Sequence, residues 1–192
     1  MKKPFRTFLR DSRGIAAIEI AFIMPFMLML YFGLADLTSV ISLNRKVTYS
    51  ADVVADLVTR HTNTVLKADI ADYYNGSDMI MAPVDPAAYQ VEIFGYRMVG
   101  TTVTQIWKTS DTAGGSCGAA PSTTAMAPLM VSGNDLILTR VCSTYTPYMA
   151  SFLGTSILGT SPFVVSESNT RRPRSSLQLT CYQTTIGGAV CS

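Results

Sequence analysis

Residues 15–35 read IAAIEIAFIMPFMLMLYFGLA, and Glu19 is the only charged residue in this run. About 20 consecutive apolar residues are enough to cross a bilayer as a helix. A charge inside hydrocarbon costs about 2–3 kcal/mol even on a lenient insertion scale, so an intramembrane carboxylate is usually functional and paired. The run therefore predicts a transmembrane helix over residues 15–36 that carries one functional acidic side chain.

Basic residues are concentrated before this run. Five of them precede residue 15, with Asp11 as the only acid, whereas the rest of the chain has 10 basic and 12 acidic residues. Since positive residues stay on the cytoplasmic side, we expect residues 1–14 to be a basic leader and the C-terminal part to be translocated. The residues beyond the leader do not carry the excess of positive charge that nucleic-acid binding requires, so we exclude nucleic acid as a partner. The basic residues of the leader are Lys2, Lys3, Arg6, Arg10 and Arg13.

Three interpretations of the N-terminus are open. It is a plain membrane anchor, a secretory signal cut at the small residues 33–35, or a prepilin-type signal cut between Gly14 and Ile15. If a prepilin-type signal is cut, the cleavage leaves a protonated amine on Ile15, which needs a counter-charge. Glu19 of a neighbouring subunit supplies that charge when the apolar faces of the helices pack together. In a lone anchor, Glu19 instead snorkels to the membrane interface. Pro25 predicts a helix kink, which either assists packing and release from the bilayer or is incidental.

The pattern RGIAAIEIAFIMP over residues 13–25 resembles the TadE-like (TadE/TadG) minor pilins of the tight-adherence (Tad/Flp) pilus. The resemblance extends over about residues 10–60. It implies membrane insertion, processing by prepilin peptidase, and a role in assembling or supporting an adhesive type IV pilus. Its implied partners are other pilins, the pilus assembly machinery and that peptidase. It implies a bacterial inner-membrane protein with a cytoplasmic N-terminus and a head that is periplasmic or exposed in a pilus. The matching positions are Gly14, Glu19, Ala21, Pro25, Gly33 and Asp36.

An apolar stripe with spacings of three and four continues beyond the span to Val65, and no Gly or Pro interrupts it between Gly33 and Gly76. This periodicity predicts one continuous helix from residue 15 to about residue 72, with residues 37–75 as an amphipathic stalk. The turn signal Asn-Gly-Ser at residues 75–77 should end it. His61, the only histidine, is expected to be a packed or half-exposed helix residue rather than a pH sensor.

Residues 76–192 predict a β-rich extracytoplasmic head. Strands are expected at residues 89–98, 103–108, 135–145 and 162–170, with a short fifth at 177–183. A long loop covers residues 110–134, and residues 148–158 form a short helix or an apolar lid. The fold class is therefore α+β and pilin-like, with a long N-terminal transmembrane and stalk helix packed against a small antiparallel β-sheet.

The four cysteines all follow the span, where an oxidising compartment favours disulfides. Three connectivities are possible, and free thiols are the alternative. The short separation of Cys181 and Cys191 favours their pairing, which leaves Cys117 with Cys142.

The sequence contains no pattern that indicates an enzyme, a metal site, a cofactor or a small-molecule substrate. His61 lies on the expected stalk, and no G-x-S-x-G elbow occurs. Arg171, Arg172 and Arg174 form a basic cluster, which we interpret as a solvated patch or as partners of acids on the helix rather than as a phosphate site. We expect a structural minor pilin; the alternative is a membrane-anchored periplasmic domain with a scaffolding role that never enters a filament.

Overall fold

The computed structural model describes residues 13–111, 117–149, 162–174, 178–181 and 191 of the chain. Contacts divide the chain into two compact units. The first contains Met1–Ser39 and Pro147–Ser161, and the second contains Val40–Thr146 and Pro162–Ser192. Most of the predicted basic leader and most of the predicted helix or lid at 148–158 lie outside the described residues.

Helix α2 (Arg13–Thr59) is the longest element, with 47 residues, and it continues through Pro25. Its residues up to Ser39 belong to the first unit. In the second unit, one face of the helix enters the core at spacings of three and four, as the apolar stripe predicted. The buried residues on this face are Leu43, Val47, Ala51, Val54 and Val58.

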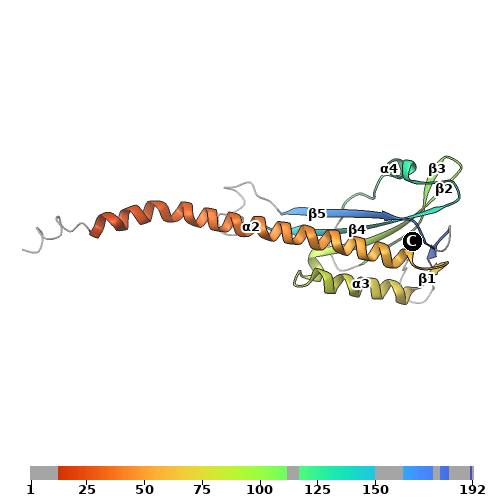
Figure 1. Ribbon diagram of the computed structural model, residues 1–192, viewed down its shortest axis with the longest axis horizontal. Coiled ribbons are helices and arrows are strands. Elements are labelled where there is room, and N and C mark those ends of the chain that lie inside the picture. Colours follow the sequence, from red (N-terminus) through yellow and green to blue (C-terminus); the bar gives the residue numbers. More distant parts are fainter. Residues whose placement is uncertain (1–12, 112–116, 150–161, 175–177, 182–190, 192) are drawn as a thin grey trace, which may run out of the picture. The chain divides into compact units, whose positions relative to one another are not determined.

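Helix α3 (Lys67–Met81) runs back along the second-unit part of α2 (Figure 1). Near its middle, Tyr73 hydrogen-bonds to His61 just beyond the end of α2. At its C-terminal end, Lys46 of α2 donates to the carbonyl oxygen of Ala82. The two helices therefore form an antiparallel pair.

The expected single helix to residue 72, ended by a turn at 75–77, is wrong. α2 ends at Thr59, whose hydroxyl donates back to the carbonyl of Ala55 at 2.8 Å, and the following His-Thr-Asn-Thr-Val run consists of poor helix formers. Gly76 lies inside α3 instead, where glycine costs about 1 kcal/mol relative to alanine. Burial of Ile70, Tyr73 and Met81 on one face of α3 offsets this cost.

Four strands form an antiparallel sheet in the order β3-β2-β4-β5. They are β2 (Tyr89–Val99), β3 (Thr102–Ser110), β4 (Asp135–Tyr145) and β5 (Phe163–Arg171). These are the four main strands that the sequence predicted. A long N-terminal apolar helix packed on a small antiparallel sheet confirms the α+β class.

The fifth strand differs from expectation. Within the described residues 178–181, Thr180–Cys181 form strand β6, and they pair in parallel with β1 (Thr64–Val65) rather than with the main sheet. The pairing of β1 with β6 is a tertiary contact between distant parts of the chain, and it draws the residues after α2 out of the helix.

The two faces of the sheet have different coverings. On one face, Val91 and Ile93 of β2 share a core with α2 and α3. On the other, Phe94 and Tyr96 pack with Met126 from the predicted 110–134 loop, which contains α4 (Thr123–Met126) and the short helix η2 (Ala127–Leu129). The alternation along β2 thus divides the head into a helix face and a loop face.

The C-terminal segment is held to the sheet by both backbone groups of Leu179. The Nε1 of Trp107 donates to the carbonyl of Leu179 at 3.0 Å, and the amide of Leu179 donates to Asp135 at 2.6 Å. Asp135 is itself buried and accepts two hydrogen bonds from the guanidinium of Arg97. A buried carboxylate with three donors is well compensated for leaving water.

Candidate functional site

The N-terminal part of α2 exposes its large apolar side chains. Ile15 is 61% exposed, Phe22 74% and Leu30 62%. A soluble monomer rarely exposes so continuous an apolar surface, so this surface requires lipid or protein around it. The helix is long and apolar enough to cross a membrane, which is compatible with single-pass anchoring.

The Gly14–Ile15 peptide bond lies in the first turn of α2. A methyl group placed on Gly14 would meet no atom within 4 Å. The first described turn of α2 also lacks acidic residues that would complement the positive end of the helix dipole.

Glu19 lies on the same helix, four residues after Ile15, with an exposed side chain. Among the described residues, Glu19 makes no hydrogen bond or ion pair. Its carboxylate is the charge that the sequence singled out, and its partner must come from another molecule or from outside the described part of the chain.

Pro25 lies beside an apolar hollow of about 360 Å³ on this helix. Proline has no N–H to donate to the carbonyl of Ala21, and the alanine side chain leaves room beside it. The kink at Pro25 stays a prediction. The residues that line the hollow are Ala21, Met24, Pro25, Leu28, Met29, Phe32 and Met149.

Asp36, at the end of the apolar run, binds the chain where it leaves β4. Its Oδ1 accepts a hydrogen bond from the amide of Tyr148 at 2.7 Å, and its Oδ2 accepts one from the amide of Met149 at 3.1 Å. The sequence offered no signal for this contact beyond the acidic residue itself, because its partners are 112 and 113 residues away.

A family model described as TadE-like protein matches residues 14–56. These residues are TadE-like. The resemblance inferred from the sequence is thereby confirmed, and the match includes Gly14, Glu19, Pro25 and Asp36. No curated protein and no solved structure matches the chain significantly. The TadE-like match suggests a protein associated with the Tad pilus, from a structural rather than an enzymatic family.

The TadE-like segment ends within α2 at Asp56, and this residue binds the predicted basic cluster. Arg174 and Arg60 both pair with Asp56, and Arg171 pairs with Asp52. The hydrogen bond from Arg60, followed by the charge of Arg174, lowers the pKa of Asp56. The interpretation of these arginines as partners of acids on the helix is therefore confirmed for two of them.

The third arginine of that cluster, Arg172, has a different partner. Its guanidinium donates to the backbone carbonyl of Leu129, the last residue of the short helix η2, at 2.7 Å. The cluster thus connects β5 both to α2 and to the loop on the other side of the sheet.

His61 is half-buried at the turn between the two helices, so the expectation that it lies within a helix is wrong. It hydrogen-bonds to the hydroxyl of Tyr73 and lies 3.8 Å from the carboxylate of Asp69. Burial, followed by the charges of Asp69 and Asp72, raises the pKa of Tyr73 to about 12. Within the described ranges, no group of three or more His, Cys, Asp or Glu side chains could hold a metal ion.

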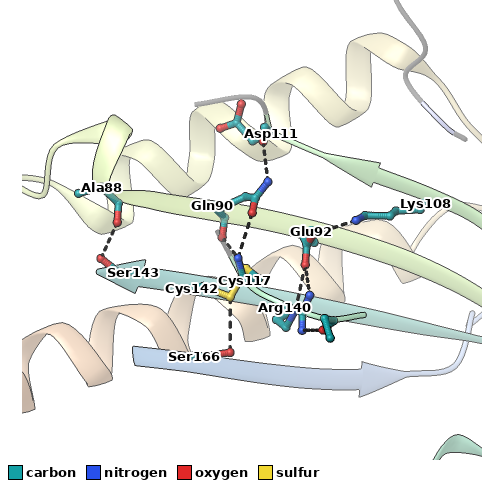
Figure 2. The surroundings of a disulfide bond; sticks show 11 residues. Ala88, Gln90, Glu92, Lys108, Asp111, Cys117, Arg140, Cys142, Ser143 and Ser166 are labelled. Carbon is teal, nitrogen blue, oxygen red and sulfur yellow. Dashed lines mark hydrogen bonds and ion pairs between the residues drawn. A yellow bond between two sulfur atoms is a disulfide. The ribbon is translucent and has the colours of Figure 1, made fainter. Parts of the chain in front are cut away.

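Two disulfides join Cys117 to Cys142 and Cys181 to Cys191, the connectivity that the sequence analysis favoured. The first attaches the 110–134 loop to β4, and Figure 2 shows Gln90 of β2 beside it. The side-chain oxygen of Gln90 accepts a hydrogen bond from the amide of Cys117 at 3.3 Å.

A buried ion triad adjoins this disulfide (Figure 2). Glu92 pairs with Arg140 across the β2–β4 register and with Lys108 at 2.9 Å, and Arg140 also donates to the carbonyl of Ala119. The sequence did not reveal the triad, because only the strand register brings the three charges together. The single carboxylate of Glu92 is thus shared by two cations, and these contacts join three strands to the 110–134 loop.

Proposed function

We propose that this chain is a membrane-inserted minor pilin or pseudopilin-like protein of a tight-adherence type IV pilus system. In this proposal, prepilin peptidase cuts it between Gly14 and Ile15, and it acts in pilus assembly and surface adherence. It sits in the bacterial inner membrane with its N-terminus cytoplasmic and its head outside. The observation that carries the proposal is Glu19, a carboxylate without a described partner, one turn from Ile15 on an exposed apolar helix.

The position of the Gly14–Ile15 bond supports processing there. A peptidase needs an extended substrate, so the helix must open locally. The first four amides of a helix have no intrahelical acceptor, and glycine is about 1 kcal/mol less favourable than alanine in a helix. Opening the first turn therefore costs little, whereas cutting further along α2 would disrupt complete helical turns.

The pairing of Glu19 with a new amine follows from the charges. Cleavage would place a protonated amine at the positive end of the helix dipole, which is unfavourable unless an anion is near. An apolar environment raises this penalty, and a buried charge that loses its partner costs about 3–5 kcal/mol. Glu19 of a neighbouring subunit would compensate the amine of Ile15, and helix packing would bring them together.

The alternative is a membrane-anchored periplasmic domain that scaffolds assembly without entering a filament. It is supported by the second unit, which has its own core and all four cysteines. The TadE-like match also ends at residue 56, so the β-sheet is outside it.

The N-terminus of the native protein tests processing. Intact mass and N-terminal sequencing of the full chain from native membranes should show that it starts at Ile15. A start at Asp36 would instead establish a cleaved secretory signal. An uncut Met1 would support the plain anchor.

Replacement of Glu19 by glutamine tests assembly, because it keeps the shape and removes the charge. We expect Glu19→Gln to insert normally but to co-purify with other pilins at least about tenfold less, as expected for a lost partner of a buried charge. Glu167→Gln, in strand β5, is the matched control and should assemble like the wild type. Unchanged co-purification of Glu19→Gln would refute the pairing and favour the scaffolding alternative.

A further inference from the structure

The carboxylate of Asp36 caps the beginning of a helical turn at Tyr148 and Met149. Amides at a helix N-terminus lack intrahelical acceptors and favour negative charge. Asp36 provides one oxygen to each amide, so the two hydrogen bonds hold Tyr148 and Met149 against this part of α2. All three residues belong to the first unit, so this contact is internal to it.

The level of this contact along the helix follows from helical geometry. The apolar run of residues 15–35 ends directly before Asp36. At 1.5 Å per residue its length is about 30 Å, the thickness of the hydrocarbon core. When this helix spans a bilayer, Asp36 therefore lies at the boundary with the outer headgroups.

Met149 lies on the membrane side of Asp36. It lines the apolar hollow together with Phe32 and Met29, which precede Asp36 by four and seven residues. Those positions are about 6–10 Å closer to the membrane centre along the helix. The neighbouring Tyr148 is 57% exposed, and tyrosine is enriched at membrane interfaces because its ring is apolar and its hydroxyl is polar.

We infer that Tyr148 and Met149, held by Asp36, form a second contact with the bilayer, at the level of its outer headgroups. The inference rests on the proposed membrane insertion of α2. The occupant is lipid rather than a protein partner, because the hydrogen bonds to Asp36 carry both residues to the bilayer whenever the helix is inserted. Asp36 is a positioning residue that returns the chain to the membrane after β4.

A nitroxide label at position 148 tests this placement in the full-length protein. The labelled Tyr148→Cys variant is reconstituted in vesicles of phosphatidylethanolamine with a minority of phosphatidylglycerol. All four native cysteines are in disulfides, so non-reducing labelling is selective. Collision rates with oxygen and with an aqueous nickel complex report depth. Labels at Ile18, in the apolar run, and at Leu129, in the head, provide the references.

The expected result is that the label at 148 lies at intermediate depth. It should collide with the nickel complex several-fold less often than the label at Leu129, but more often than the label at Ile18. A label at 148 as water-accessible as that at Leu129, with Ile18 in hydrocarbon, overturns the inference and leaves the proposed anchoring intact. If the Ile18 label is also in water, both the anchoring and the inference are wrong.

A second variant tests the role of Asp36. Asp36→Ala removes both acceptors and should move the label at 148 into water and increase its mobility. Thr38→Ala is the matched control, because the Thr38 hydroxyl bonds to the carbonyl of Leu34 in its own helix. Fluorescence of Trp107 in the second unit verifies that each variant is folded. An unchanged depth at 148 in Asp36→Ala would refute the positioning role.

Discussion

Alanine in place of Gly95 should strongly destabilise the head, because the ring of Trp107 occupies the space of the new methyl group. An ideal Cβ on Gly95 would lie 2.4 Å from both Cε2 and Nε1 of that ring. Carbon atoms in ordinary contact are about 3.5–4.0 Å apart, so the ring or strand β2 must move by about 1 Å. Trp107 is only 5% exposed, and its Nε1 is bonded to the carbonyl of Leu179.

The magnitude follows from two costs. Overpacking a core typically costs about 1–3 kcal/mol. Moving the indole also breaks its hydrogen bond to Leu179, and a buried donor left without a partner costs about 1–3 kcal/mol more. We therefore expect a loss of about 2–6 kcal/mol in the free energy of unfolding. At about 2–4 °C per kcal/mol, Tm should fall by about 4–24 °C.

The assay is thermal unfolding of the full chain in detergent, followed by the fluorescence of Trp107, the only tryptophan. Gly76→Ala is the matched control. It lies inside α3, and a methyl group there would meet no atom within 4 Å. Because alanine is about 1 kcal/mol more favourable than glycine in a helix, Gly76→Ala should raise Tm by a few degrees.

Two results would refute this reasoning. If Gly95→Ala unfolds within a degree or two of the wild type, the close approach of Trp107 to β2 is wrong. If both alanine variants lose the same stability, the effect does not come from the contact with Trp107. The emission maximum of the folded Gly95→Ala variant should also shift to the red, since a displaced indole is more exposed.

Three further predictions concern the disulfide and the titrating groups. Replacing Cys117 and Cys142 together by serine should cost about 3 kcal/mol in unfolding free energy, as expected for a loop of this length, and denaturant titration measures it. Because the pKa of Asp56 is lowered, its ion pairs stabilise the fold above pH 3.8 and lose that effect as the pH falls further. Acid-denaturation curves of the wild type and of Asp56→Asn should therefore show a stability difference that shrinks below pH 3.8. The raised pKa of Tyr73 implies a contribution to stability that is fully present below pH 10.0 and is lost as the pH rises towards 12. Tyrosinate absorbance should therefore show that this phenol ionises at a higher pH in the folded wild type than in denaturant. The Tyr73→Phe variant identifies which part of the absorbance comes from Tyr73.

Local patterns predicted the parts of this fold that depend on local forces. The spacing of Leu43, Val47 and Val54 identified the buried face of α2, and the alternation in 89–98 identified β2. Local patterns did not predict where α2 ends. The pairing of Thr64 with Thr180 competes with helix continuation, and this contact joins residues 116 positions apart. The same limit applies to Glu92 and Arg140, which meet only through the strand register.

The two carboxylates of the TadE-like segment differ in their partners, and this difference separates their roles. Asp36 binds two backbone amides of its own chain, so its charge is compensated before any assembly begins. Glu19 has no such partner among the described residues, although it lies within the apolar run, one turn from its start. An uncompensated carboxylate in hydrocarbon favours association with a cation, whereas a compensated one does not. Glu19 is therefore suited to drive association with another subunit, and Asp36 to hold the chain in place at the membrane boundary.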